Sequence, residues 1–380
     1  MQLHGLAGII SIDREGQRAT VRAGTPIHQL GRLLWDHGLA LRNQGDIDRQ
    51  AIGGALGTGT HGTGRSLPCL SAEIEGFRLV TASGEVLTCT PSENAEIFEA
   101  GRVSFGAFGI MTDVTLGLRP RHALHVEERI VPVAEAIASF EALSRRHRQV
   151  EFFWFPYADA VLLKTLSDTD ATPRAPRSLE AMAARGARTG SAERLFDWGC
   201  RVIRFMPSLT APIHRFFTDN AAEPDRVRWS HEAFPSARSI RFNEMEYAVP
   251  AAQGLDCLQE LVSAVRQKRI ATGFPFEFRL VRGDTIPLSP FEGGDRCTIA
   301  VHQHHRHPGQ VLFSLAESIF RRYGGRPHWG KLHSLEAAAF EALYPAFGRV
   351  RSLRRRLDPK GRFLNAHLAA IFGEDTGAAR

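Results

Sequence analysis

In the first third of the chain, the spacing of apolar residues predicts short strands joined in hairpins. Apolar and polar positions alternate over residues 8–13 and 18–24 on either side of a turn, and again over residues 73–89 around Ser83-Gly84. Another alternating run begins at Ile110. Alternation of this kind is typical of a sheet that packs one face on a core.

Helical signals in this part of the chain are fewer. Residues 25–38 repeat apolar positions every three or four residues, with Thr25 placed to cap the first turn and Pro26 at the first helical position. Thr90 followed three residues later by Glu93 is a capping-box pattern and predicts a second helix start. We therefore expect a small α+β unit in this stretch.

From about residue 122 onward, strands alternate with longer helices. The runs with strand or helix periodicity are residues 126–131, 133–147, 151–164, 244–250, 254–268, 274–281, 296–303 and 309–323. Strand–helix–strand units of this kind predict an α+β fold with an antiparallel sheet. We expect two domains, residues 1–122 and 123–335, and a C-terminal segment, 336–380, that returns to the first domain.

Residues 167–226, rich in Ala, Arg, Ser and Pro, interrupt the second pattern and suggest a loose region. Within them, residues 192–206 form one amphipathic helical piece. We interpret it as a helix packed on its own domain, and a helix lying on a membrane surface is the alternative.

Amino-acid composition narrows the class of protein and its cellular setting but does not indicate a particular chemistry. The chain of 380 residues is 43% hydrophobic and 23% charged with a net charge of +6, which indicates a globular protein. Its five cysteines are scattered without zinc or disulfide spacing, so we expect a reducing, cytoplasmic setting, with peripheral membrane association as a possibility. No secretory signal or membrane-spanning run is visible.

The segment GDIDRQAIGGALGTGTHGTG, residues 45–64, holds seven glycines and three threonines. Residues 57–62 fit the spacing of a dinucleotide-binding loop, but glycines precede them where a strand is needed, and Pro68 follows where a helix is needed. No Gly-Lys-Ser/Thr is present for a phosphate loop. Bare backbone with hydroxyl donors suits a large, flat cofactor, and FAD is the first candidate.

With these residues in view, the chain resembles the vanillyl-alcohol-oxidase-type flavoproteins. Within them it is most similar to the sugar-1,4-lactone oxidases and the related alditol oxidases. Besides the glycine segment, the resemblance is carried by four stretches: NEMEYAVP (243–250), FEFRLV (276–281), RPHWGK (326–331) and LDPKGRFLN (357–365). It implies a two-domain α+β flavoprotein with an FAD-binding domain and a cap domain that binds the substrate.

The resemblance also implies a set of site residues. Glu277, Arg279 and Lys331 would be catalytic, and Asp46 and His304 would join them in binding the substrate. The cofactor would be contacted by Gly45, Asp46, Ala51, Gly53, Gly54, Ala55, Leu56, Gly57, Thr58, Gly59, Ile110 and His328. Independently of any family, Glu277 and Arg279 stand two residues apart on a predicted strand and so share a face, where they could hold a polyol or form a surface salt bridge.

One part of the family pattern has no counterpart here. Family members begin with a loop that holds the FAD pyrophosphate and often carries a histidine bonded to the flavin, whereas this sequence starts at MQLHGLAGIISID. We therefore expect FAD to bind without a covalent link. Either the true start lies upstream or the chain is truncated, and a non-catalytic remnant is an alternative function.

The reaction implied is hydride transfer from a carbinol carbon to flavin, with a sugar lactone as substrate and a polyol as the alternative. Gly45 matches the position beside the flavin edge where oxygen approaches in relatives. Because glycine has no Cβ, we expect oxygen to be the electron acceptor, giving hydrogen peroxide. The alternative is that Gly45 only relieves strain in a turn.

Two further patterns carry no predicted function. The run HQHHRH, residues 302–307, lacks a nearby carboxylate or cysteine in sequence, and alternate strand residues face opposite ways, so we predict no metal site. The arginines of residues 349–362 are interpreted as a solvated helix face, and no nucleic-acid-binding motif is present.

Overall fold

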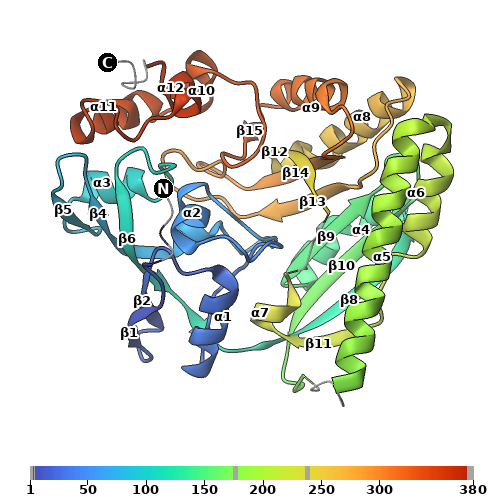
Figure 1. Cartoon of the computed structure of the whole chain (residues 1–380), viewed down its shortest axis with the longest axis horizontal. Coiled ribbons are helices and arrows are strands. Elements are labelled where there is room, and N and C mark those ends of the chain that lie inside the picture. The colour runs from blue at the N-terminus through green and yellow to red at the C-terminus, as the bar shows by residue number, and fades with distance from the viewer. Residues whose placement is uncertain (1–2, 4, 174–178, 236–239, 375–380) are drawn as a thin grey trace.

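Two antiparallel sheets organise the chain, as the sequence predicted (Figure 1). In the computed structural model, a five-stranded sheet lies within residues 9–117, and an eight-stranded sheet is built from residues 123–327. The structure describes all residues except 1, 2, 4, 174–178, 236–239 and 375–380. For residues 179–189 it describes the backbone alone.

The five-stranded sheet has the order β1-β2-β6-β4-β5. Its strands are β1 (Ile9–Asp13), β2 (Arg18–Arg22), β4 (Ile74–Val80), β5 (Val86–Cys89) and β6 (Ile110–Gly117). Val21, Val114 and Phe77 lie opposite one another on neighbouring strands and are buried, so the predicted alternation does place one face on a core. Around this sheet lie α1 (Ile27–Asp36), α2 (Ile52–Gly57), η1 (Leu70–Glu73), α3 (Ala95–Gly101) and the short pair β3 (Leu39–Ala40) and β7 (Arg119–Pro120).

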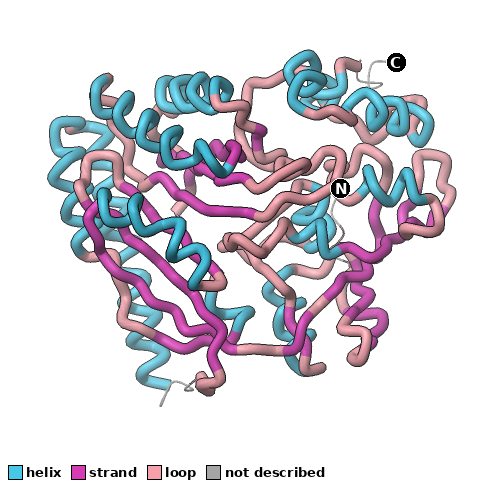
Figure 2. Tube along the Cα trace, turned by 180° about the vertical axis from the view of Figure 1, so that it is seen from behind, coloured by secondary structure: helices cyan, strands magenta, loops and turns pink. Residues whose placement is uncertain are grey.

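The eight-stranded sheet has the order β11-β8-β10-β9-β13-β14-β12-β15. Its strands are β8 (Ala123–Pro132), β9 (Gln149–Trp154), β10 (Ala160–Thr169), β11 (Arg226–Trp229), β12 (Phe242–Pro250), β13 (Phe276–Val281), β14 (Arg296–His304) and β15 (Arg326–Pro327). Helices α4 (Val133–Arg146), α8 (Gly254–Gln267) and α9 (Gln310–Arg322) pack on it (Figures 1 and 2). The remaining short elements are α7 (Ser230–Ala233) and η3 (Ala251–Gln253).

Strand alternation separates an apolar face of this sheet from a charged one. Phe152 of β9 and Phe278 of β13 are paired in register, stack at 4.9 Å, and meet Phe140 of α4. Their neighbours Glu151 and Arg279 are also paired in register and point to the opposite face. All six residues of β13 are buried, so both faces of this strand are covered.

The stretch predicted as loose is largely helical in the structure. It contains α5 (Leu179–Phe205), η2 (Pro207–Leu209) and α6 (Thr210–Asp219), which lie side by side at one edge of the molecule (Figure 1). Ala and Arg favour helix, and the apolar residues Phe196, Cys200 and Ile203 give this segment a packing face. Its composition was therefore a poor guide to its structure.

The C-terminal helices α10 (Ala337–Leu343), α11 (Phe347–Leu357) and α12 (Ala366–Phe372) lie over the five-stranded sheet (Figure 1). The Arg356 guanidinium pairs with Glu96 of α3 at 2.5 Å, and Arg362 donates to the Ala82 carbonyl at 2.9 Å. The Phe372 ring lies 6.4 Å from Phe105.

Two predicted helix caps differ from the structure. The Thr25 hydroxyl donates to the Arg22 carbonyl at 2.7 Å and accepts from the Gly8 N–H, so it holds the N-terminal segment, and Pro26 stands at the N-cap of α1. Thr90 accepts from the Glu93 N–H at 3.0 Å, but this bond closes a local turn, because α3 begins only at Ala95.

All five cysteines are buried and free. In the described part of the chain, no helix has the length and apolar content that a membrane span requires.

His214 of α6 makes stability depend on pH. The ring is fully buried, Nε2 donates to the Thr272 carbonyl at 2.8 Å, and Nδ1 accepts from the Tyr157 N–H, so the neutral form is the one that fits. Burial lowers the pKa of His214 to about 4. The unfolded chain thus binds more protons between pH 4 and 6.5, and stability falls as pH drops through that window.

We expect the cost to be about 2 kcal/mol at pH 5 for this residue alone. Thermal unfolding of the wild type and His214→Gln between pH 7 and pH 5 checks it. The variant should be less stable at pH 7 but should lose less stability on acidification. An unchanged slope in the variant would assign the acid sensitivity to other groups.

Candidate active site

The glycine segment and the RPHWGK stretch, far apart in sequence, meet in the structure. A Cβ on Gly330 would lie 3.7 Å from the Cβ of Thr58, and the rings of His61 and His328 lie 5.8 Å apart. Trp329 packs on Phe105 at 4.1 Å between ring centres. These contacts place the residues that directly follow α2 beside residues 328–330, which follow β15.

The glycine segment is also bonded to the strand that carries Glu277 and Arg279. The Gly64 N–H donates to the Leu280 carbonyl at 2.7 Å, and the Thr63 hydroxyl accepts from the Leu280 N–H at 3.2 Å. Thr63 also donates to the Val150 carbonyl of β9 at 2.7 Å. Backbone groups from both parts of the chain therefore share one hydrogen-bonded structure at this point.

The first group of buried charges lies on the face of β9, β10 and β13 that the apolar side chains leave free. The Lys164 ammonium lies 3.1 Å from Glu151, and Glu151 in turn accepts from the Arg279 guanidinium at 2.7 Å. Arg279 also pairs with Glu277. All four side chains are buried, so each charge is stabilised by an opposite charge in place of solvating water.

A second group runs alongside it from β12 and β14. His302 contacts the Glu244 carboxylate at 3.1 Å, and Glu244 accepts from the Lys331 ammonium at 2.6 Å. Lys331 also pairs with Glu246, whose other oxygen lies 2.7 Å from Nε2 of His61. The Glu246 carboxylate thus joins the glycine segment to Lys331.

Charge pairing sets the protonation of the first group. Burial alone would raise the pKa of the Glu151 carboxyl, but Lys164 and Arg279 outweigh it and lower that pKa to about 2. Burial would lower the pKa of Arg279, whereas the Glu277 and Glu151 carboxylates raise it above its ordinary value. The charge of the Asp46 carboxylate adds to this rise.

The second group behaves in the same way. Burial would lower the pKa of Lys331, but Glu244 and Glu246 raise it above its ordinary value. Both carboxyls have lowered pKa values despite their burial, chiefly because of Lys331. Burial and Lys331 together lower the pKa of His328 to about 3, so this ring is neutral near pH 7. Because its own pKa is raised, Lys331 remains a fixed positive charge at this pH.

The structure brings most of the predicted site residues together. Glu277, Arg279 and Lys331 belong to the two buried groups, and His328 lies beside His61. The Asp46 carboxylate is near enough to stabilise the charge of Arg279. The glycines, together with Ala51, Ala55, Leu56 and Thr58, form and flank α2, which packs on η1 and β6. Ile110 begins β6, pairs with Val80 and is half-buried.

His304 lies elsewhere. Its Nε2 contacts Asp197 of α5 at 2.9 Å, beyond the outer end of the second charge group. The histidine that reaches the carboxylates is His302, two residues earlier on the same face of β14. Four histidines within six residues gave no signal for choosing between them.

Sequence reasoning also missed His61, Glu151, Lys164, Glu244 and Glu246. For the last four a usable signal exists, because each is a charged residue inside an otherwise apolar strand, as in VEFFW, LLKTL and NEMEY. A charge in such a strand must find a partner on the same face.

The surface next to these groups suits a flat, partly anionic cofactor such as FAD. Gly54 is exposed, and no atom lies within 4 Å of the position its Cβ would occupy, so the backbone of α2 is bare there. Gly53 differs, because its Cβ would press on Ala23 at 2.9 Å. Residues 51–59 would hold the cofactor, and Lys331 is the nearby positive charge that would favour its reduced, anionic form.

Three of the charged side chains could also form a metal site. Ligand atoms of Glu244, Glu277 and His302 lie within 4.8 Å of one another. Lys331 and Arg279 already neutralise the two carboxylates through direct contacts, so we assign no metal to them.

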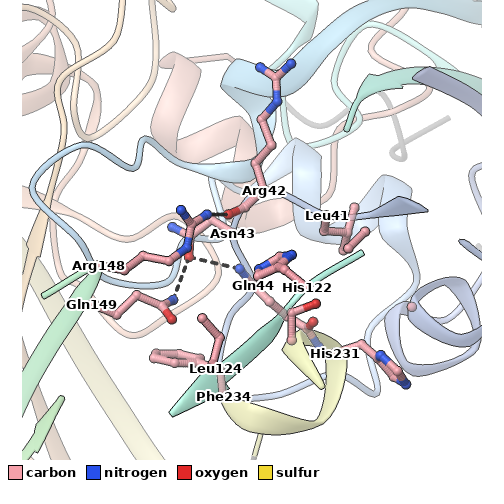
Figure 3. A pocket seen from close by; sticks show the side chains of 13 residues that line it. Leu41, Arg42, Asn43, Gln44, His122, Leu124, Arg148, Gln149, His231 and Phe234 are labelled. Carbon is pink, nitrogen blue, oxygen red and sulfur yellow. Dashed lines mark hydrogen bonds between the residues drawn. The ribbon is translucent and has the colours of Figure 1, made fainter. Parts of the chain in front are cut away.

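A small polar cavity lies behind this cluster, between residues 40–44 and the outer strands of the large sheet (Figure 3). Its walls carry buried polar atoms that lack partners within the described residues, among them Gln44 Nε2 and Gln149 Oε1. Phe234 lines it and also lies 5.4 Å from the Arg279 guanidinium. Phe234 thus separates this cavity from the first group of charges. The size and polarity of the cavity suit water as its occupant.

Comparison with known proteins agrees with this geometry. Residues 114–371 match the D-arabinono-1,4-lactone oxidase family, and residues 1–90 match an FAD binding domain. The chain is 35% identical to L-gulono-1,4-lactone dehydrogenase of Mycobacterium tuberculosis over 373 residues, covering 98% of this chain and 86% of that protein.

Two further similarities extend this result. L-gulonolactone oxidase of Scyliorhinus torazame is 32% identical, with 98% of this chain and 85% of that protein covered. A solvent-stable cholesterol oxidase shares the fold, with a TM-score of 0.79 at 17% identity over 97% of this chain and 84% of that one. The chain therefore belongs to the D-arabinono-1,4-lactone oxidase family of FAD-dependent oxidoreductases.

Proposed function

We propose that the protein oxidises a sugar 1,4-lactone of the D-arabinono or L-gulono type. The observation that carries the proposal is the pair of buried charge groups directly beside the glycine segment. A neutral, hydroxyl-rich ring can exchange hydrogen bonds with carboxylates and cations at once, which an apolar alcohol cannot. Bound FAD would accept the hydride from the carbinol carbon.

Each side chain then has a distinct task. Glu277 accepts a hydrogen bond from the reacting hydroxyl and is placed to receive its proton, while Arg279 donates to the neighbouring oxygen and holds Glu277 in position. Lys331 supplies the positive charge that offsets the negative charge gained on reduction. Asp46, whose charge acts on Arg279, and Glu244, which contacts Lys331, would fix the remaining hydroxyls.

We propose oxygen as the electron acceptor. The support is Gly45, which leaves no side chain over the approach, and the oxidase name of the Scyliorhinus torazame relative. The Mycobacterium tuberculosis relative is named a dehydrogenase. The structure adds a packing reason for this glycine. A Cβ at Gly45 would lie 3.2 Å from the His61 carbonyl oxygen and 3.3 Å from Cγ2 of Thr60.

The catalytic assignment predicts large kinetic effects. Arg279→Ala and Lys331→Ala should each slow flavin reduction by about a hundredfold or more, and Glu277→Gln should do likewise, because each removes a preorganised charge. Stopped-flow reduction by D-arabinono-1,4-lactone, L-gulono-1,4-lactone and xylitol measures this and separates lactone from alditol oxidation. His304→Ala is the matched control and should reduce flavin at close to the wild-type rate. Wild-type rates in all three site variants would leave these residues with a structural role only.

Substitutions at two glycines of the same segment distinguish an effect on cofactor binding from an effect on folding. Gly54→Ala adds a methyl group on the bare surface, so we expect weaker FAD binding with an unchanged melting temperature. Gly62→Ala would overlap the Gln44 carbonyl oxygen and should lower the melting temperature of the protein without added FAD. Flavin titration and thermal unfolding of both variants check this. Unaltered FAD affinity in Gly54→Ala would place the cofactor on another surface.

The acceptor proposal is tested by reoxidation. Flavin reduced without air should react rapidly with oxygen to give hydrogen peroxide, and Gly45→Ala should slow this step. Because the new methyl group would crowd Thr60, the double variant Gly45→Ala/Thr60→Ser serves as a control that removes the contacting methyl. Reoxidation that returns to the wild-type rate in the double variant would assign the effect to packing. Sluggish wild-type reoxidation with fast quinone reduction would make the enzyme a dehydrogenase.

A further inference from the structure

One face of α5 is apolar but remains uncovered. Leu195, Trp198, Phe205 and Met206 are 44%, 60%, 77% and 53% exposed, and we refer to these four residues as the apolar stripe. Leu195, Trp198 and Phe205 recur at intervals of three and seven residues, which keeps them on one side of α5 at 100° per residue, and Met206 directly follows the helix. The half-buried Val202 lies between them.

The stripe is separate from the face by which α5 packs on its domain. Cys200 and Ile203 are buried, and the Phe196 ring lies 5.0 Å from Phe217 and 4.9 Å from Phe274. The packing interpretation made from the sequence therefore accounts for one side of this helix and leaves the stripe unexplained.

The stripe is unlike the other exposed apolar residues of the molecule. In the described residues, the exposed phenylalanines and tryptophans are Trp198, Phe205 and Phe216 of α6, whereas the exposed apolar residues elsewhere are aliphatic. Single exposed aliphatic residues are ordinary on a protein surface. Aromatic residues gathered on one helical hairpin mark an interaction surface.

Basic residues border the stripe. Arg194, Arg201 and Arg204 are exposed on α5, and Arg215 is exposed on α6. Of the acidic residues of α5 in this region, Asp197 is turned toward His304 and pairs with Arg201, and Glu193 is half-buried. The edge of the molecule therefore combines bulky apolar side chains with guanidinium groups.

We infer that the apolar stripe docks the protein on an anionic lipid surface. The hairpin lies at the outer edge of the molecule, where a convex helix meets a flat, deformable bilayer more readily than a second convex protein surface (Figure 1). Trp and Phe settle at the level of the lipid head groups, and arginines beside them contact lipid phosphates. From Leu195 to Phe205 the stripe spans about 15 Å of helix, so it lies along the surface without crossing it. This inference is independent of the proposed substrate.

Vesicle co-sedimentation of the full chain tests the inference. We expect binding to vesicles of phosphatidylcholine mixed with phosphatidylglycerol, weaker binding to phosphatidylcholine alone, and a further decrease at high salt. Phe205→Ser/Met206→Ser should lower the partition by about tenfold or more, since two buried apolar side chains are lost. Arg201→Gln/Arg204→Gln should remove most of the preference for the anionic vesicles.

Val311→Ser provides the matched control, because Val311 is 65% exposed on α9, outside the stripe. Its partition should equal that of the wild type. All the changed residues are exposed, so circular dichroism and melting temperatures should match the wild type. Equal loss in Val311→Ser, or a wild type that stays in the supernatant with both vesicles, overturns the inference. A concentration-dependent dimer that dissociates in Phe205→Ser/Met206→Ser, with no vesicle binding, would show that a second copy covers the stripe.

Discussion

The carboxylate of Glu246 is the interaction on which the site depends most. One of its oxygens contacts His61 in the glycine segment, and the other contacts Lys331 after β15, with all three side chains largely or fully removed from solvent. A buried ammonium without a counter-ion would lose its proton or leave the interior, so Lys331 can remain charged there only because Glu244 and Glu246 face it. Removing one partner of such a group typically costs about 3–5 kcal/mol, since the other charge is left unpaired.

This arrangement follows from the period of the strands. Phe152 and Phe278 fill the space under α4, and the residues that alternate with them are thereby forced onto the face toward the glycine segment. A strand with Phe-Glu-Phe-Arg-Leu-Val is suited to such a position, because one set of side chains supplies the core and the other supplies the chemistry. The fold and the site are thus specified by the same alternation.

Sequence reasoning predicted the two-part α+β fold, the antiparallel sheets and FAD, because hairpins, strand–helix units and the glycine segment are local patterns. It proposed Glu277 and Arg279 from their spacing on one strand together with a family resemblance, and Lys331 from the resemblance. Contacts between distant strands bring these three residues together. It missed Glu151 and Lys164, whose roles depend on pairing across β9, β10 and β13. It listed His304 from the family resemblance, whereas His302 is the histidine that contacts Glu244 in the structure. Position along β14 relative to the carboxylates is set by register, which no local pattern in HQHHRH reveals. Residues 167–226 were predicted as a loose region but are largely helical, because composition alone does not show which residues of a segment can pack as one face of a helix.

The bonds from Gly64 and Thr63 to Leu280 and Val150 have a consequence for motion. Many enzymes with two domains admit their ligands by swinging the domains apart about a hinge. Here the end of the glycine segment shares backbone hydrogen bonds with the central strands of the large sheet, so such a swing would have to break the sheet-like pairing itself. A substrate must therefore enter through rearrangement of side chains and surface segments around a rigid frame. The two sheets should keep their relative position as ligands enter and leave, because these bonds hold the glycine segment to the large sheet.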